Sequence, residues 1–486
     1  MIPVLTTGVP NLDEILGGGL PTGAMTLILG VPGSGKTILA EQIAVHQAKG
    51  GAQVLVFTAL SESHDRLLAA LREFSFADET LVGDTLRYLS IQTTLDEGLA
   101  VTAETVVTTA RLERATFVVI EGLHSLTGFA KSRPEVLTFL YTLRSRLALL
   151  GITTLVTYET GPDELSESGV LTIADGIIRM YNTLTEERHH RRLAVQKLRA
   201  MAPLDGLHSV TITRDGITCY PRQEAAYHAM RYAIGEGRMS LGLPELDAMM
   251  AGGPNEGTAT FLAGSPGTGK TLTALYFAMA GVARDEPALF VGLSESAEQL
   301  YVKARDFGLD LAAAVARDAV SLLSVSPAAL DVDVLAARIR EQVERRGVRR
   351  LVIDTFAVVE QEIPFRSRTL RYLSSLLDYL REHGVTTVLT QDSAAFDSGG
   401  TSQSIAAMLA DNMLLLRLVE YRNGLYRILS VRKMRQSGFD AGLREFRIES
   451  GAVRVLPVAE SVPGILGGIT AQEQREARMG RRNRQE

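Results

Sequence analysis

The sequence predicts an α/β protein of two tandem domains, each a mostly parallel sheet flanked by helices, with antiparallel strands added at one sheet edge. Two observations carry this prediction. The stretch Gly30–Thr37 (GVPGSGKT) returns as Gly264–Thr271 (GSPGTGKT). In each half of the chain, short runs rich in Val, Ile and Leu alternate with longer helical patterns. Continuous apolar strands separated by helices are typical of a parallel sheet covered on both faces.

Both stretches match the P-loop pattern G-x-x-x-x-G-K-[ST]. In this pattern, backbone N–H groups surround phosphates, the lysine reaches the β and γ oxygens, and the hydroxyl ligates Mg²⁺. A helix N-terminus adds partial positive charge at the same place. We therefore expect binding of a purine triphosphate, ATP, with Mg²⁺. The expected nucleotide contacts are Gly30, Gly33, Ser34, Gly35, Lys36, Thr37 and Ile38 in the first copy and Gly264, Gly267, Thr268, Gly269, Lys270, Thr271 and Leu272 in the second.

The rest of the chain repeats in step with the P-loops. Lys36 and Lys270 are offset by 234 residues, and the Gly-x-Pro-x-Leu-Asp leaders at Gly8 and Gly242 share that offset. The register then shifts only slightly, as expected of a true internal duplication. The predicted domains are residues 1–225 and 239–460, with a linker near Arg222–Arg238. Residues 461–486 form a basic tail that we expect to be disordered.

The parallel strands can be placed from their apolar runs. In the first copy they are expected at Thr26–Leu29, Val54–Thr58, Leu86–Ile91, Phe117–Ile120 and Thr153–Tyr158. From Gly176 in the first copy, and from Asn412 in the second, further strands with turn glycines follow. These are the expected antiparallel additions at the sheet edge.

The composition of the chain argues against several classes of protein. The formal net charge of 486 residues is only −6 and the pI is about 5.9, so nucleic acid is an unlikely partner. The apolar runs are strand-sized, far below a membrane span, and the N-terminal residues lack a signal-peptide pattern. The single cysteine, Cys219, is expected to be a buried apolar residue. We expect a soluble, cytoplasmic protein.

Taken together, the leaders, the two Pro-Gly-x-Gly-Lys-Thr loops, the pairs Ser61-Glu62 and Ser294-Glu295, and the late triplets Lys197-Leu198-Arg199 and Lys433-Met434-Arg435 resemble the KaiC family of RecA-like ATPases. The resemblance covers the chain from Gly8 to about Pro457. It implies RecA-like domains in a homo-hexameric ring, with ATP bound between subunits and hydrolysed slowly. In the clock proteins of the family it also implies self-phosphorylation in the second domain.

Two acids at strand ends are candidate metal residues. Asp354 ends the apolar run Leu351–Asp354, where a carboxylate can hold a Mg²⁺-bound water beside the phosphates. In the first copy Glu121 stands at this place, and its extra methylene changes the reach of the carboxylate. The second site is therefore expected to have the more regular metal geometry. The alternative is that each acid merely terminates a strand.

Catalytic roles come from the resemblance. The family usually has two adjacent glutamates after the second strand, whereas this chain has a serine first, Ser61 or Ser294. Either Glu62 and Glu295 orient the attacking water, or hydrolysis is very slow. A helix-capping role for the Ser61–Asp65 stretch is an alternative.

The late triplets and an aromatic residue complete the expected site. By resemblance, Lys197, Arg199, Lys433 and Arg435 reach the γ-phosphate in the neighbouring subunit, with Leu198 and Met434 between them also counted as nucleotide contacts. Alternate positions of a strand make both cations of a triplet face one way; a solvated basic strand edge is the alternative. Phe307, more than Phe74, is a candidate to stack on adenine, although either could be a core residue.

The phosphoacceptor pair of the clock proteins falls on Ala407 and Met408, shortly before Asp411, and neither has a hydroxyl. Thr401, Ser402 and Ser404 lie nearby. The favoured function is a regulatory ATPase ring; the alternatives are an autophosphorylating serine/threonine kinase and a non-hydrolysing ATP-binding scaffold. A regulatory protein could bind through the C-terminal region.

Overall fold

The computed structural model describes residues 3–58, 64–123, 129–130, 132–160, 169–185, 188–227, 235–392, 404–421 and 424–458. The chain divides into two compact units, Met1–Ala226 and Tyr227–Glu486. Ser61, Glu62, Thr401, Ser402 and the tail 461–486 lie outside the described residues.

The described strands of the first unit are β1 Val4–Leu5, β2 Leu20–Pro21, β3 Met25–Gly30, β4 Val54–Thr58, β5 Leu86–Ser90, β6 Phe117–Glu121, β7 Thr153–Glu159, β8 Gly176–Thr185, β9 Arg188–Leu198, β10 His208–Thr213 and β11 Gly216–Tyr220. Its described helices are α1 Leu12–Leu16, α2 Lys36–Lys49, α3 His64–Leu71, α4 Gln92–Leu95, α5 Leu99–Leu112, α7 Arg133–Leu149, α8 Val170–Ile173 and α9 Gln223–Ala226, with a 3₁₀ turn at Glu79–Leu81.

The described strands of the second unit are β12 Ala259–Gly264, β13 Ala288–Gly292, β14 Val320–Ser324, β15 Arg350–Asp354, β16 Thr386–Asp392, β17 Asn412–Tyr421, β18 Gly424–Met434, β19 Arg444–Glu449 and β20 Ala452–Pro457. Its described helices are α10 Pro244–Met249, α11 Lys270–Ala280, α12 Ala297–Asp306, α13 Leu311–Ala316, α14 Val332–Arg346, α15 Phe356–Glu362, α16 Arg366–Glu382 and α17 Ile405–Leu409, with 3₁₀ turns at Val282–Arg284 and Pro327–Ala329.

Each unit is built on a nine-stranded sheet, with orders β11-β10-β9-β8-β3-β7-β6-β4-β5 and β14-β13-β15-β16-β12-β17-β18-β19-β20. The strands from β8 to β5 in the first sheet, and from β14 to β17 in the second, pair in parallel. The remaining pairs are antiparallel. The predicted α/β fold with antiparallel edge strands is therefore confirmed. The expectation that the strands from Gly176 and Asn412 are all antiparallel additions is wrong for the first of each set, because β8 and β17 pair in parallel with β3 and β12.

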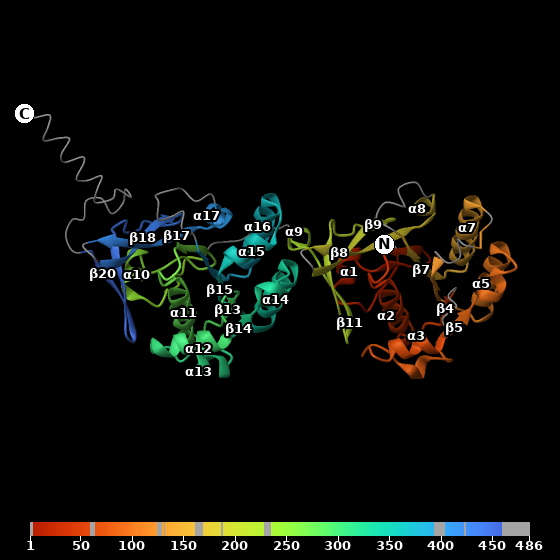
Figure 1. Ribbon diagram of the computed structural model, residues 1–486, viewed down its shortest axis with the longest axis horizontal. Coiled ribbons are helices and arrows are strands. Elements are labelled where there is room, and N and C mark those ends of the chain that lie inside the picture. Colours follow the sequence, from red (N-terminus) through yellow and green to blue (C-terminus); the bar gives the residue numbers. More distant parts are fainter. Residues whose placement is uncertain are drawn as a thin grey trace, which may run out of the picture. The chain divides into compact units, whose positions relative to one another are not determined.

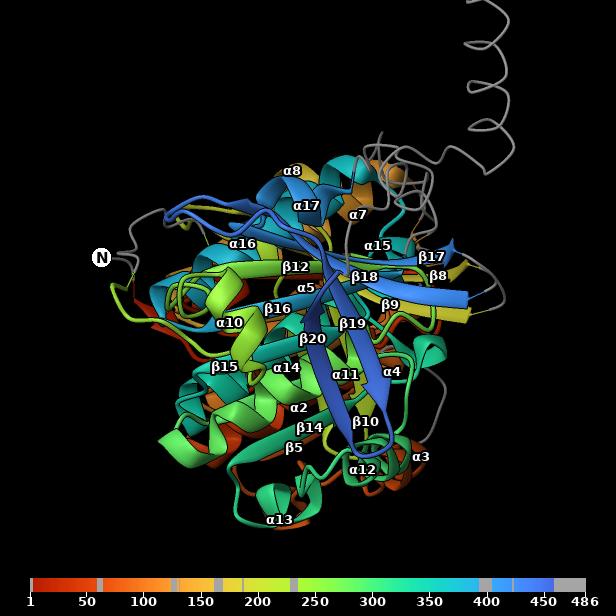
Figure 2. The same cartoon turned by 90° about the vertical axis from the view of Figure 1, so that its left-hand side faces the viewer.

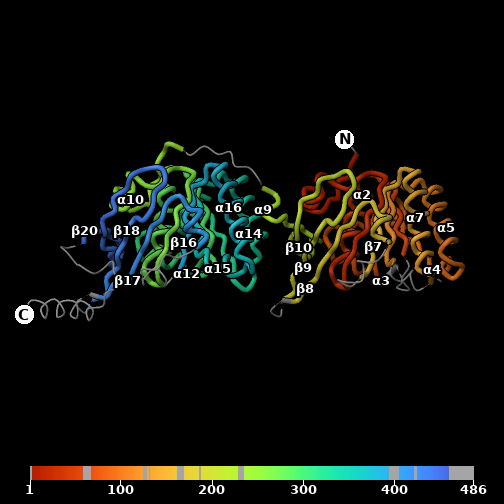
Figure 3. The backbone as a smooth tube through the Cα atoms, turned by 90° about the horizontal axis from the view of Figure 1, so that it is seen from above, coloured from red at the N-terminus to blue at the C-terminus, as the bar shows by residue number. Residues whose placement is uncertain are grey.

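Helices cover both faces of each sheet because successive strand residues point to opposite faces. In the second unit, Leu262 and Phe290 pack with α10 and α11, whereas Phe261 and Leu289 pack with α14 and α16. Figure 1 shows the sheet between these two helix pairs. In the first unit α5 and α7 lie side by side on one face (Figures 1 and 3).

The strand carrying each P-loop lies in the middle of its sheet. β3 is between β7 and β8, and β12 is between β16 and β17. Gly269, the last loop residue before α11, has a φ of 104°, and a Cβ there would lie 2.7 Å from the Phe446 ring of β19. Figure 2 shows β19 and β20 turning away from the direction of β12 and crossing in front of α11. This approach explains why glycine is needed at position 269.

Three further expectations from the sequence concern Cys219, the linker and membrane-spanning helices. Cys219 is buried, and burial raises the pKa of its thiol to about 12. The expected linker contains one short described helix, α9, whose Gln223 is fully buried. Across the described ranges, no helix is long and apolar enough to cross a membrane.

Candidate nucleotide-binding sites

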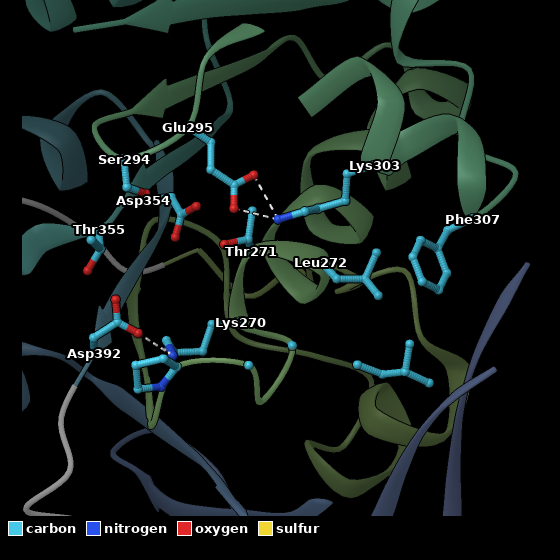
Figure 4. A pocket seen from close by; sticks show the side chains of 14 residues that line it. Lys270, Thr271, Leu272, Ser294, Glu295, Lys303, Phe307, Asp354, Thr355 and Asp392 are labelled. Carbon is cyan, nitrogen blue, oxygen red and sulfur yellow. Dashed lines mark hydrogen bonds and ion pairs between the residues drawn. The ribbon is translucent and has the colours of Figure 1, made fainter. Parts of the chain in front are cut away.

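A cavity of about 430 Å³ opens at the P-loop of the second unit. Figure 4 shows its side chains converging from the loop, from the ends of three strands and from α12. The residues that line it are Pro266, Gly267, Gly269, Lys270, Thr271, Leu272, Ser294, Glu295, Lys303, Phe307, Asp354, Thr355, Asp392 and Ile448. Its position at the carboxyl ends of parallel strands is where open α/β sheets bind ligands.

Lys270 lies at the end of the cavity where the P-loop pattern predicts phosphate. Its side chain is 6% exposed, and its ammonium donates to the carbonyl oxygens of Gly264 at 2.9 Å and Ser265 at 2.7 Å. The same ammonium lies 2.5 Å from a carboxylate oxygen of Asp392 (Figure 4). The lysine charge is thus balanced by an acid from the end of β16, and an arriving phosphate would compete with this acid.

Thr271 and Asp354, the residues expected to hold the cation, lie side by side in this cavity. Asp354 is 3% exposed, and burial raises its pKa above the ordinary value. Hydrogen bonds from Thr390 and Thr271 oppose that rise, and Thr390 donates to the Oδ1 atom. A buried carboxylate beside a hydroxyl at the start of the loop helix provides the hard oxygen donors that Mg²⁺ prefers. The residues present therefore fit the expected cation.

Glu295 faces the same cavity but is paired with a cation. Lys303 on α12 donates to both of its carboxylate oxygens, as the dashed lines of Figure 4 show. In the second unit the helix is capped by the residue after Glu295, because Ser296 caps α12 in a capping box with Gln299. Ser294 and Glu295 precede the helix and line the cavity.

Phe307 lies at the apolar end. It follows α12 directly, and it lines the cavity with Leu272 and with Ile448 of β19. A flat ring beside aliphatic lining residues, at the end of the cavity away from Lys270 in Figure 4, is a suitable surface for a planar base. Phe74 of the first unit instead stacks on Phe76, with ring centroids 5.3 Å apart.

In the first unit the P-loop has the same local form. Gly35 has a φ of 102°, and a Cβ there would lie 2.9 Å from Ile212. The Lys36 ammonium donates to the Val31 carbonyl at 2.9 Å. Burial lowers the pKa of Lys36, and the charge of Glu159 partly opposes this. The Ser34 hydroxyl is buried with no hydrogen-bond partner among the described residues, and Ile38 packs at the edge of the core.

Glu121 ends β6 and is 3% exposed. Burial, and then the charge of Glu41, raise the pKa of Glu121 to about 8, against a hydrogen bond with Thr37. Glu121 is thus beside the P-loop hydroxyl as Asp354 is beside Thr271.

The late cationic triplets do not line the cavity of the second unit. The Lys433 ammonium donates to the Ala410 and Ala407 carbonyls at 2.6 and 3.3 Å, and Arg435 donates to the Met408 carbonyl at 3.0 Å. Both cations of the triplet therefore bond to the segment of α17.

The first unit repeats this arrangement. Lys197 donates to the Ala174 and Leu171 carbonyls at 2.7 and 3.1 Å, and Arg199 lies 3.3 Å from Asp175. Leu198 is 6% exposed in the core, and its counterpart Met434 packs partly against the core of the second unit. Their side chains thus face their own units.

The phosphoacceptor region is partly described. Ala407 and Met408 lie in α17, and Asp411 directly precedes β17. Ser404 is buried and donates to the Gln391 side chain at 2.9 Å.

Three polar residues of the second site escaped the sequence analysis: Lys303, Asp392 and Thr390. Asp392 and Thr390 carried a usable signal, since both belong to the strand next to the P-loop strand and a strand's carboxyl end faces the ligand. Lys303 carried none, because it reads as an ordinary polar residue of an amphipathic helix. Within the described ranges there is no group of three or more His, Cys, Asp or Glu that could hold a metal ion.

Comparison with known proteins gives a consistent result. The family model of the KaiC ATPase matches residues 5–224 and again residues 239–460. The chain is 26% identical to the circadian clock oscillator protein KaiC of Picosynechococcus sp., over 96% of this chain and 92% of that protein. It is also 26% identical to the circadian clock protein KaiC3 of Synechocystis sp., over 99% of this chain and 97% of that protein.

Proposed function

The chain belongs to the KaiC family of ATPases, and on that premise we propose that it binds Mg·ATP at both P-loops and hydrolyses it slowly in a homo-hexameric ring. The observation that carries the proposal is the cavity of the second unit, where Lys270, Thr271 and Asp354 meet at one end and Phe307 lies at the other. Its relatives named above are circadian clock proteins, so we propose a regulatory output, in timing or signalling, in the cytoplasm.

In this proposal Lys270 and the loop N–H groups bind and orient the β and γ phosphates. Thr271 and Asp354 would hold Mg²⁺, which when bound neutralises phosphate charge; Thr37 and Glu121 would do so in the first unit. Glu295, and Glu62 by the repeat, would orient the attacking water. Lys433 and Arg435 would act on the nucleotide of the neighbouring subunit, which is compatible with their absence from the cavity of their own unit.

A non-hydrolysing ATP-binding scaffold is the second candidate, favoured by one observation. Both carboxylate oxygens of Glu295 accept hydrogen bonds from Lys303, so a water molecule would share this acid with a cation that makes it a weaker base. Phosphate release by wild type and by a Glu62→Gln/Glu295→Gln variant separates the two functions. Equal background rates would favour the scaffold.

The autokinase alternative has weaker support, because Ala407 and Met408 lack hydroxyls and Ser404 is buried. Intact-mass measurement after incubation with Mg·ATP tests it directly, since each phosphate transferred adds a fixed mass. We expect an unshifted mass.

Binding stoichiometry tests the central proposal. Equilibrium dialysis of the full chain with labelled ATP and Mg²⁺ should give two nucleotides per chain, one for Lys36→Ala or Lys270→Ala, and none for the double variant. Lys49→Ala removes an exposed lysine of the same helix as Lys36, one that bonds only to the Phe76 carbonyl at 2.9 Å among the contacts described, and should keep two. Binding by the folded double variant would refute the proposal. Light scattering with and without ATP tests the ring.

A further inference from the structure

The P-loop helix of the first unit carries a fully buried acid. Glu41 of α2 is 0% exposed and follows Thr37 by four residues, so both side chains lie on one face of the helix. Its Oε2 atom accepts a hydrogen bond from the Tyr88 hydroxyl at 2.7 Å. Its Oε1 atom is buried and has no hydrogen-bond partner among the described residues.

Glu121, at the end of β6, also has a buried carboxylate oxygen, Oε1, without a partner among the described residues. It contacts Thr37 through a side-chain hydrogen bond. Burial is the larger cause that raises the pKa of Glu41 to about 7 and of Glu121 to about 8, and the charge of Glu41 contributes to the latter. Two adjacent buried carboxyl groups, each with an unsatisfied oxygen, are costly unless a ligand binds them.

The second unit shows that the fold does not need this acid. Lys36 and Lys270 start equivalent helices, so Glu41 corresponds to Leu275, which is fully buried in the apolar core. Tyr88 and Leu322 are equivalent as the third residues of their strands. The acid and its phenol partner are therefore specific to the first unit.

We propose that Glu41 is part of the divalent-cation site of the first unit, which with Glu121 and Thr37 takes one cation even when nucleotide is absent. Carboxylate and hydroxyl oxygens are hard donors suited to Mg²⁺ or Mn²⁺, and one divalent cation supplies the charge and the contacts that the two unpartnered oxygens lack. The inference rests on the proposed function only in placing the cation at the end of β6.

The probe is Mn²⁺ alone, measured by electron paramagnetic resonance on the full chain without nucleotide. Wild type should bind one Mn²⁺ per chain. Glu41→Leu installs the residue of the second unit and should bind this ion at least about tenfold more weakly. Glu14→Leu removes an exposed acid of the same unit and should bind as wild type does. Wild type that binds no Mn²⁺, or a Glu41→Leu variant that binds as wild type, overturns the proposal.

A second variant distinguishes loss of the cation site from misfolding. Glu41→Gln keeps the shape and the bond to Tyr88, and Mn²⁺ should raise the melting temperature of wild type but not of Glu41→Gln. An equal rise in both also overturns the proposal. ATP binding is measured on the same samples, so a chain that binds ATP but not Mn²⁺ alone contradicts this inference and leaves the proposed function standing.

Discussion

The ammonium group of Lys303 lies 2.5 and 2.7 Å from the two carboxylate oxygens of Glu295, inside the cavity of the second unit. The corresponding position of the first unit, eight residues after Glu62, is Ala70. Glu295 is therefore paired with a cation that the first copy lacks at the equivalent position. If these glutamates orient the attacking water as proposed, the two sites should differ in hydrolysis.

Lys303→Met should speed hydrolysis at the second site, because it removes the cation that pairs with Glu295 and competes with water for its oxygens. A partly exposed ion pair contributes at most about 1 kcal/mol, so phosphate release should rise about two- to fivefold. The gain should disappear when Lys270→Ala is added. Lys303→Arg keeps a cation beside Glu295 and serves as the matched control. A lower rate in Lys303→Met would instead assign Lys303 to contact with the phosphates.

Chains with complementary defects should restore activity when mixed. Lys433→Ala/Arg435→Ala lacks the cations and Lys270→Ala lacks the P-loop lysine, so each is expected to lose second-site hydrolysis, by about a hundredfold or more for the cations. Mixed without nucleotide and then supplied with Mg·ATP, they should form sites that combine an intact loop with intact cations. Phosphate release equal to the average of the separate variants would contradict action between subunits.

Asp411→Ala should destabilise the second unit. Asp411 accepts from Arg381 at 3.0 Å and from the backbone N–H of Ala259, the first residue of β12, at 2.9 Å. Both charged side chains are less than a tenth exposed. Breaking a buried pair costs about 3 kcal/mol or more, seen as an earlier urea transition. Glu341→Ala breaks an exposed helical pair with Arg345 and should change stability by no more than about 0.5 kcal/mol.

The first unit should lose stability in mild acid through His208. This side chain is buried, accepts from the Arg222 backbone N–H at 3.0 Å and contacts the Leu204 carbonyl at 3.1 Å through Nε2. Burial lowers the pKa of His208 below its ordinary 6.5. The unfolded chain therefore takes up a proton before the folded chain does. The contribution of neutral His208 to the free energy of unfolding is complete above pH 6.5. It is lost as the pH falls towards the lower pKa of the folded state, by at most about 1.4 kcal/mol per pH unit.

Urea unfolding of wild type and His208→Gln between pH 7.5 and 5 measures this effect. The difference in unfolding free energy between the two proteins should shrink as the pH falls, since only wild type carries the titrating imidazole. A difference that is constant with pH would show that the pKa of His208 is the same in the folded and the unfolded chain.

Much of the fold followed from local pattern. The apolar runs placed five of the six parallel strands of the first copy within one residue of β3 to β7, because strands buried on both faces must be continuously apolar. β15 begins one residue before the apolar run Leu351–Asp354, at Arg350, which does not read as a core residue. Its side chain is nonetheless 0% exposed, because Glu286 lies 2.5 Å away and Nη1 donates hydrogen bonds to the carbonyls of Ser240 and Phe277.

The sequence by itself determined the two P-loops, the duplication and the acids at the strand ends, because each is set by the order of neighbouring residues. Only the tertiary structure decided which charges meet. Lys303 of α12 pairs with Glu295, which precedes that helix, Asp392 at the end of β16 pairs with Lys270 of α11, and the packing of α2 on β6 brings the buried Glu41 beside Glu121. The last two contacts join residues far apart in the chain, and all three depend on folded geometry that local pattern does not specify.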